Sequence, residues 1–371
     1  MKSNLLRAHA GYAFILPWLI ALVVFVGYPF LAGFYFSFCD FAPLRGPMFI
    51  GTANYSELAG DAAFHRSLGA TMIYAAAAIP LGVLLALTLA MLLNTRIRGQ
   101  SVYRVVFYLP HLVPTVAVAI LWMWIFNPKF GLLNMVLSGV LKAVDGWTGA
   151  FLGGPALFCT MAIPVVLAFV VRRRRLRWLT LLAVAAGVMA AIALANYGAN
   201  RFFPGDMKKL HEPGWLSDGS PFPSGVPFAP PWALWALIVM SMWSVGQMAV
   251  IYLAKLQDVP AELYEAADID GANWWHKTRH ITLPMISPVI LFNVVMAIIG
   301  TFQVFAEPYI MTGGGPEQKT RFVAMFVYDE AFLYQRIGYA SAVAWVLFLV
   351  IVGLTLLAFR ISRRYVYYAG R

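Results

Sequence analysis

Long apolar runs, separated by short polar or proline-containing segments, dominate the pattern of hydrophobic and polar positions along the 371-residue chain. A run of about 20 apolar residues can cross the hydrocarbon core of a bilayer, which is about 30 Å thick. Backbone groups inside lipid must be satisfied within the segment, so such runs form α-helices. The pattern therefore predicts an all-α integral membrane protein with eight spans, at about residues 12–37, 68–93, 107–126, 149–171, 178–196, 232–256, 285–311 and 339–360.

Composition supports a membrane protein and excludes other classes. Hydrophobic residues make up 61% of the chain and charged residues 12%, against about 25% charged residues in soluble domains. The net charge is +11, but the basic residues lie between spans, where membrane orientation explains them, and we expect no nucleic-acid partner. The first apolar run lacks a small-residue cleavage site, which favours a retained helix over a signal peptide. Cys39 and Cys159 predict neither a disulfide framework nor a metal site.

The distribution of Lys and Arg predicts the orientation. Most of them fall in segments on the same side of the membrane as the N-terminus, so the positive-inside rule predicts cytoplasmic N- and C-termini. The strongest anchor is the run Arg172–Arg175 with Arg177, which we interpret as a tight cytoplasmic turn between the fourth and fifth spans. A patch that binds lipid headgroups or nucleotides is the alternative interpretation of this run.

One internal loop is markedly acidic, with Asp258, Glu262, Glu265, Asp268 and Asp270 within thirteen residues. We expect Asp258 to cap a short helix that begins near Pro260 and ends at Gly271, because proline suits the first turn and glycine the left-handed stop. Asn273 can cap a second short helix, and Pro284 marks the return to the membrane. The loop therefore predicts a helix-turn-helix at the cytoplasmic surface.

Two other interpretations of this loop are weaker. An amphipathic helix resting on lipid headgroups would carry basic residues, whereas these acids would be repelled by anionic lipid. His276 and His280 are four residues apart, a spacing that could hold a metal, but no third ligand lies nearby in the sequence. We therefore favour a structural role for the two histidines and predict no metal site.

No residue set in the chain supports covalent chemistry, and the Gly-x-x-x-x-Gly-Lys-Ser/Thr phosphate loop is absent from the sequence. The chain is therefore not expected to be an enzyme. Polar and aromatic residues deep in the sixth and seventh spans can line a path for a solute, because intramembrane polar groups usually face the bundle interior. Hydrogen bonding between helices is the alternative explanation. These residues are Ser241, Trp243, Ser244, Gln247, Asn293, Thr301, Gln303, Phe305 and Glu307.

The acidic loop carries a recognisable motif. Glu265-Ala266-Ala267, with Gly271 and then Ile281-x-Leu283-Pro284 after it, resembles the EAA loop of the membrane-spanning subunits of bacterial ABC importers that work with a substrate-binding protein. Flanking segments resemble the carbohydrate-uptake branch of the maltose-permease type. These segments are residues 256–264, 107–110, 131–134 and 312–316.

The resemblance implies a type I ABC importer permease core of six spans in the bacterial inner membrane. It implies import of a sugar or sugar-like solute together with a second permease subunit, as a heterodimer, and two cytoplasmic ATP-binding subunits. A periplasmic or lipid-anchored substrate-binding protein would deliver the solute. ATP and Mg would bind the ATPase subunits, and this chain would bind no cofactor. The loop residues expected to contact the ATPase are Glu262, Glu265, Ala266, Ala267, Asp270, Gly271 and Pro284.

The chain departs from the family pattern after the third span. Segments resembling Gly-Leu-Leu-Asn and Trp-Leu-x-Asp, which usually flank a short external loop, are residues 131–134 and 215–218 here. We interpret the intervening chain as an inserted hairpin of two spans, at about 146–200, which brings the total to eight. The expected organisation is an N-terminal span and external loop at 1–67, a permease domain at 68–360 interrupted by the hairpin, and a cytoplasmic tail at 361–371.

A stand-alone secondary transporter or channel for a small polar solute is the alternative function. Such a protein would need an intramembrane charge relay or inverted repeats. The spans hold Glu307 as a lone acid and no clear internal repeat. The sequence therefore favours the importer subunit.

Overall fold

The computed structural model describes residues 15–95, 99–136, 214–219, 230–364 and 366. The expected spans at 149–171 and 178–196, and the arginine run between them, lie outside the described residues. The helices are α2 (Tyr28–Ser37), α3 (Ala53–Gly60), α4 (Ala62–Leu93), α5 (Gln100–Leu112), α6 (Thr115–Ile125), α11 (Trp232–Ser241), α12 (Gly246–Gln257), α13 (Ala261–Ile269), α14 (Trp274–Lys277), α15 (Leu283–Phe302), α16 (Ala306–Met311), α17 (Val323–Tyr328) and α18 (Ile337–Ser362).

The described part of the chain holds four helical stretches that are long and apolar enough to cross a membrane, and two bent helix pairs raise the number to as many as six. They correspond to six of the eight expected spans. The stretches are Ile15–Ser37, Ala62–Leu93, Trp274–Met311 and Ile337–Ser362, and the bent pairs are α5 with α6 and α11 with α12. The helical membrane architecture is therefore confirmed, and the two remaining spans stay predictions.

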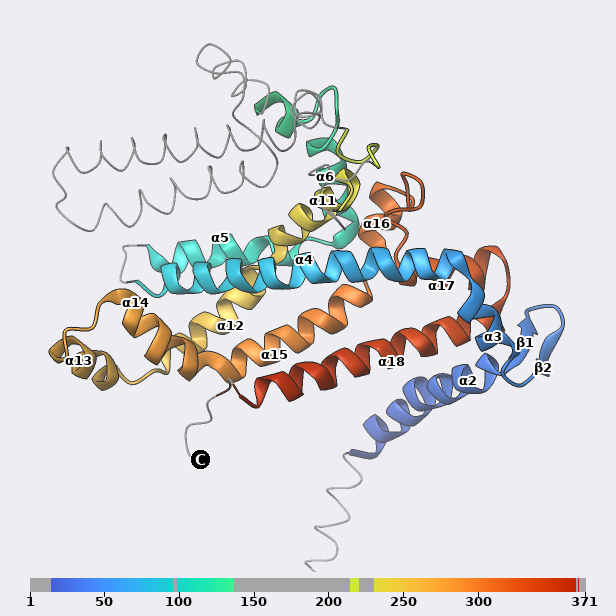
Figure 1. Ribbon diagram of the computed structural model, residues 1–371, viewed down its shortest axis with the longest axis horizontal. Helices are drawn as coiled ribbons and strands as arrows, with labels where there is room; N and C mark the ends of the chain where they lie inside the picture. The colour runs from blue at the N-terminus through green and yellow to red at the C-terminus, as the bar shows by residue number, and fades with distance from the viewer. Residues whose placement is uncertain (1–14, 96–98, 137–213, 220–229, 365, 367–371) are drawn as a thin grey trace, which may run out of the picture.

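Helix α4 lies between α5 on one side and α15 and α18 on the other (Figure 1). Small residues are buried at every fourth position along it, at Ala78, Gly82, Ala86 and Ala90. They let α12 and α15 pack closely on α4, as small residues do between membrane helices. The helix begins at residue 62 rather than 68, because the carboxylate of Asp61 caps it by accepting a hydrogen bond from the Ala63 N–H at 2.7 Å.

The expected third span at 107–126 corresponds to a sharply bent pair of helices, a bend that the sequence analysis did not predict. Helices α5 and α6 meet at an angle of 97°. Pro114 has no N–H to continue the first helix, and it holds Val113 in an extended conformation, with φ −74° and ψ 130°. Helix α5 therefore runs beside α4, and α6 turns away toward α11 and α16 (Figure 1).

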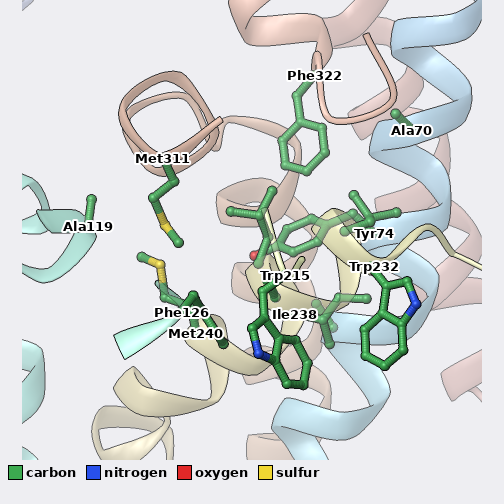
Figure 2. Close-up of a cluster of buried hydrophobic side chains, with 14 of the residues drawn as sticks. Ala70, Tyr74, Ala119, Phe126, Trp215, Trp232, Ile238, Met240, Met311 and Phe322 are labelled. Atoms are coloured by element: carbon green, nitrogen blue, oxygen red, sulfur yellow. The ribbon is translucent and has the colours of Figure 1, made fainter. Parts of the chain in front are cut away.

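The largest buried cluster fills the space where α4, α6, α11, α16 and the segment 214–219 meet (Figure 2). The indoles of Trp215 and Trp232 pack edge to face, with ring centroids 5.1 Å apart, and the Trp215 indole also packs on Phe126. The Trp215 Nε1–H donates a hydrogen bond of 2.7 Å to Oδ1 of Asn134, across 81 positions of sequence. The two segments that flank the predicted insertion therefore meet in space.

A charged cluster, here called the clasp, joins the start of α18 to α3 and the start of α4. Arg336 binds the carboxylate of Glu57 at 2.5 Å and lies 3.5 Å from that of Glu330. Its guanidinium also lies over the ring of Tyr339, whose hydroxyl donates to Asp61 at 2.7 Å. The clasp lies beside the hairpin of β1 (Cys39–Ala42) and β2 (Gly46–Phe49), at the end of the bundle opposite α13 and α14 (Figure 1).

The pKa values of two clasp carboxyls, Glu330 and Asp61, are shifted in opposite directions. Burial raises the pKa of Glu330 above its ordinary value, although Arg336 and Arg321 partly offset this effect. Burial also acts to raise the pKa of Asp61, but hydrogen bonds from Tyr339 and the Ala63 N–H outweigh it and leave the pKa lowered. The clasp is therefore built around the ionised form of Asp61.

Candidate functional site

The acidic loop folds as two short helices, α13 and α14, joined by a tight turn; residues 258–284 are called the elbow below. Gly271 has φ +72°, and the Ala272 N–H donates to the Ala267 carbonyl at 2.9 Å, so α13 ends there as expected. Asn273 Oδ1 accepts the His276 N–H at 2.9 Å, which confirms the predicted cap of α14. The predicted cap by Asp258 was wrong, because its carboxylate lies 3.6 Å from Lys255 instead.

One face of α13 is attached to the rest of the protein. The hydroxyl of Tyr264 lies 3.0 Å from that of Thr282, and the carboxylate of Asp268, four residues further on, pairs with Lys277. Residues four apart lie on the same side of a helix. Glu262, Glu265 and Ile269 lie off this face and are exposed.

The outward face combines acids with apolar side chains. Glu262, Glu265, Asp270 and Ala266 are exposed, whereas Ala267 is half-buried. Within the described part of the chain, the three carboxylates form no salt bridge. The apolar side chains exposed on the elbow are Leu263, Ile269, Trp274 and Trp275, and Ile269 is 87% exposed.

Pro284 lies apart from this face. It occupies the first turn of α15 and is half-buried. Helix α14 continues through a π-helical turn (Thr278–Thr282) into α15, so the stretch Trp274–Met311 counts as one helical run. The elbow is therefore joined to a membrane span without a loop.

A cavity of about 540 Å³ opens inside the bundle, between the bend of α5 and α6, the break between α11 and α12, and helices α4, α15 and α16. Seven of the nine candidate path residues line it, namely Ser241, Trp243, Ser244, Gln247, Asn293, Thr301 and Glu307. Polar residues from two different spans therefore share one cavity.

The other two candidates, Gln303 and Phe305, do not line the cavity. Gln303 is exposed where α15 ends. The ring of Phe305 stacks on that of Tyr309, with ring centroids 5.0 Å apart, and its centroid lies 5.1 Å from that of Tyr328. Packing within an aromatic cluster at the end of the span thus explains the position of the Phe305 side chain.

The sequence analysis missed Tyr74, from α4, and His111 and Thr115, from the two sides of the α5–α6 bend, all of which line the cavity. Tyr74 is the only tyrosine of the mostly apolar helix α4, and the prolines at 110 and 114 bracket His111. These were the signals that could have identified them. Among the residues lining the cavity, Glu307 is the only carboxylate, and there is no Lys or Arg.

A close backbone contact fixes one wall of the cavity. The span α11–α12 bends by 43° at Val245, after a 3-10 turn (Met242–Ser244). At Gly246 a β-carbon would lie 1.8 Å from the carbonyl oxygen of Phe107, so only glycine permits α12 and α5 to cross there. This crossing points the residues on either side of the break, Ser244 and Gln247, into the cavity wall.

The described residues contain no group of three or more His, Cys, Asp or Glu side chains arranged to hold a metal ion. The rings of His276 and His280 stack at 5.9 Å, and Nδ1 of His280 lies 3.1 Å from the His276 carbonyl oxygen. This packing within the helix gives the pair a structural explanation.

Comparisons with known proteins agree with this architecture. The chain is 32% identical, over all of its length and 94% of the relative, to the probable ABC transporter permease protein YesP of Bacillus subtilis. It is 26% identical to the trehalose/maltose transport system permease protein MalF of Thermococcus litoralis, over 98% of this chain and 96% of that one.

A solved structure shares the fold. This is a bacterial alginate ABC transporter in complex with its periplasmic protein bound to an alginate pentasaccharide, and one of its chains superposes with a TM-score of 0.68 at 19% identity, over 98% of this chain and 97% of that one. The family model described as binding-protein-dependent transport system inner membrane component matches residues 78–367. The chain therefore belongs to the family of inner membrane components of binding-protein-dependent transport systems.

Proposed function

We propose that this chain is a membrane-spanning subunit of an ATP-driven sugar importer and forms half of its translocation path. Family membership supports a transport role, and the similarity to a trehalose/maltose permease supports a saccharide as the solute. The observation that carries the proposal is that one helical run connects an outward-facing acidic elbow to an internal cavity that polar side chains help to line.

The elbow is proposed to dock on a cytoplasmic ATPase subunit. Its inner face is already occupied by the Tyr264–Thr282 contact and the Asp268–Lys277 pair. Glu262 and Glu265, beside an exposed Ile269, form no salt bridge with any residue that the structure describes. A partner cleft with an apolar socket and a basic rim would complement this surface.

The helical run from Trp274 to Met311 offers a mechanical connection. Thr301 lies 27 residues after Trp274, a distance of about 40 Å at 1.5 Å per residue. A displacement of the elbow by the ATPase would therefore move a wall of the cavity directly. This makes the bundle a two-state element biased from a remote site.

The cavity is proposed to take neutral saccharides rather than acidic ones. Hydroxyl, amide and indole groups from Ser244, Gln247 and Trp243 suit sugar hydroxyls and sugar faces. A solute carboxylate or phosphate would meet the Glu307 carboxylate with no Lys or Arg on this side of the path to compensate.

The remaining parts of the importer are also proposals. A second permease would close the other side of the cavity as a heterodimer, two ATP-binding subunits would hold ATP and Mg, and a periplasmic or lipid-anchored binding protein would deliver the sugar. The elbow must then lie in the cytoplasm, as the positive-inside rule predicts for this loop and both termini.

Uptake by the assembled importer in proteoliposomes tests the proposal, with radiolabelled trehalose as the neutral probe and a uronic-acid disaccharide as the anionic one. ATP-dependent accumulation of the neutral sugar is expected. Glu307→Gln should narrow the discrimination against the anionic sugar by about tenfold, the effect of a pair interaction of about 1.4 kcal/mol. Solute movement by this chain alone, without ATPase subunits, would instead establish a stand-alone transporter.

A further inference from the structure

A second hollow, separate from the central cavity, runs between α15 and α18 at the end of the bundle that carries the elbow. Its volume is about 580 Å³, and we call it the α15–α18 groove. Its walls are mostly apolar, and the apolar side chains that line it include Leu283, Ile290, Leu291, Val294, Ala358 and Ile361.

The length of the groove matches one leaflet of a bilayer. It extends along one helical run from Arg279 to Val294, 15 residues or about 22 Å at 1.5 Å per residue. Half of a bilayer, with the polar headgroup region included, is about 20–22 Å thick. A groove whose mouth lies at the membrane surface therefore reaches about the middle of the bilayer.

The mouth of the groove is basic. Arg279 lines it, and α18 ends beside it with Arg360, Arg363 and Arg364, all four being exposed. None of these arginines forms a salt bridge with a residue that the structure describes. Asp268 of α13 is already paired with Lys277.

We propose that the α15–α18 groove binds an anionic glycerophospholipid, with its phosphate at Arg279 and the end of α18 and one acyl chain along the apolar walls. Guanidinium groups pair with phosphate oxygens through two parallel hydrogen bonds, and basic pockets between membrane helices are suited to anionic headgroups. A neutral lipid would fill the apolar walls equally well but would leave the arginines without a counter-charge.

This site is independent of the sugar path, although it shares a helix with it. The groove contacts the first half of α15, whereas the central cavity is lined by the same helix from Phe292 onward. A lipid bound in the groove would therefore contact α15, the helix that joins the elbow to the cavity.

Native mass spectrometry of the purified full-length chain tests the proposal, with phosphatidylglycerol and phosphatidylcholine of identical acyl chains as probes. Phosphatidylglycerol should bind at least about fivefold more tightly, the contribution of one arginine near an anionic headgroup. Arg279→Gln should remove about fivefold of that preference and leave phosphatidylcholine unchanged. Ile361→Trp, which fills the groove from an exposed position, should weaken both lipids.

Matched controls separate the groove from general surface charge and from misfolding. Arg45→Gln removes an exposed arginine at the opposite end of the protein, and Leu356→Trp adds an indole to α18 outside the groove. Both controls should retain the wild-type lipid preference, and all variants should elute as the wild type does in size-exclusion chromatography.

Three outcomes would overturn the proposal. The first is equal affinity of the wild type for the two lipids, and the second is an equal loss of preference in Arg45→Gln and Arg279→Gln. The third is loss of the bound lipid when the second permease subunit is present, which would make the groove a subunit interface.

Discussion

The two ends of the helix bundle differ in how their acidic side chains are paired. At the clasp, Arg336 is shared between Glu57 and Glu330, and Asp61 is bound by Tyr339. At the elbow, Glu262, Glu265 and Asp270 are exposed and form no salt bridge within the described residues. Both ends are rich in acids, but each clasp acid has a partner within the chain, whereas the elbow pairs Asp258 and Asp268 and leaves three acids without a salt bridge to a described residue.

This difference separates structural charges from charges held for a partner. Charge pairs within the chain fix how α3, α4 and α18 meet, and their removal should affect stability. Unpaired acids on a helix whose other face is anchored contribute little to the fold of the chain. Their removal should affect association with another protein. Variants at both ends can therefore be tested for both stability and association.

The largest effect is expected at the elbow. Glu265→Lys should leave the chain inserted and stable but weaken docking of the ATPase by about 2–5 kcal/mol, a loss of 30-fold or more, because a basic partner would then face a like charge. Co-purification of the ATPase and sugar uptake would both measure this loss.

The control for Glu265→Lys is Asp40→Lys, the same change at an exposed acid of β1 at the opposite end of the bundle. It should leave ATPase co-purification unchanged. Normal uptake and co-purification in Glu265→Lys would refute the docking role.

A smaller effect of another kind is expected at the clasp. Arg336→Ala removes the partner of Glu57 and the guanidinium beside the buried Glu330, and should lower the free energy of unfolding by about 1–3 kcal/mol. Thermal unfolding in detergent measures the change, with Arg45→Ala as the exposed control. A clasp variant that unfolds as the wild type does, yet loses the ATPase, would remove the distinction between the two ends.

The smallest effect is expected from deletion of residues 146–200, because the segments that flank them already meet through the Asn134–Trp215 hydrogen bond. This deletion should change uptake by no more than about twofold. Loss of transport with normal ATPase assembly would show that this segment contributes to the path.

Local signals in the sequence were sufficient to predict where some helices begin and end. Asn273 caps α14 and Gly271 ends α13 as expected, because both effects depend on a few neighbouring residues. Asp258 shows the limit of this reasoning, since its carboxylate has a second local partner, Lys255 three residues earlier, and pairs with it instead of capping α13.

Long-range geometry was not predictable from the pattern. The prolines at 110 and 114 were visible, but the 97° angle between α5 and α6 depends on packing against α4 and α12. Tyr74 reaches the cavity from a helix that is mostly apolar, and Phe305 looks like a path residue until its stack with Tyr309 is seen. Hydrophobic periodicity identifies spans, but not which of their faces meet.

The hydrogen bond between Asn134 and Trp215 joins the two segments that flank the inserted sequence. Because these two segments meet, the packing of the rest of the bundle does not depend on the length of the chain between them. Descendants of one ancestral permease can therefore gain or lose sequence there while the elbow, the cavity and the helix between them keep their alignment. Such a junction is a natural place to graft a reporter domain without altering transport.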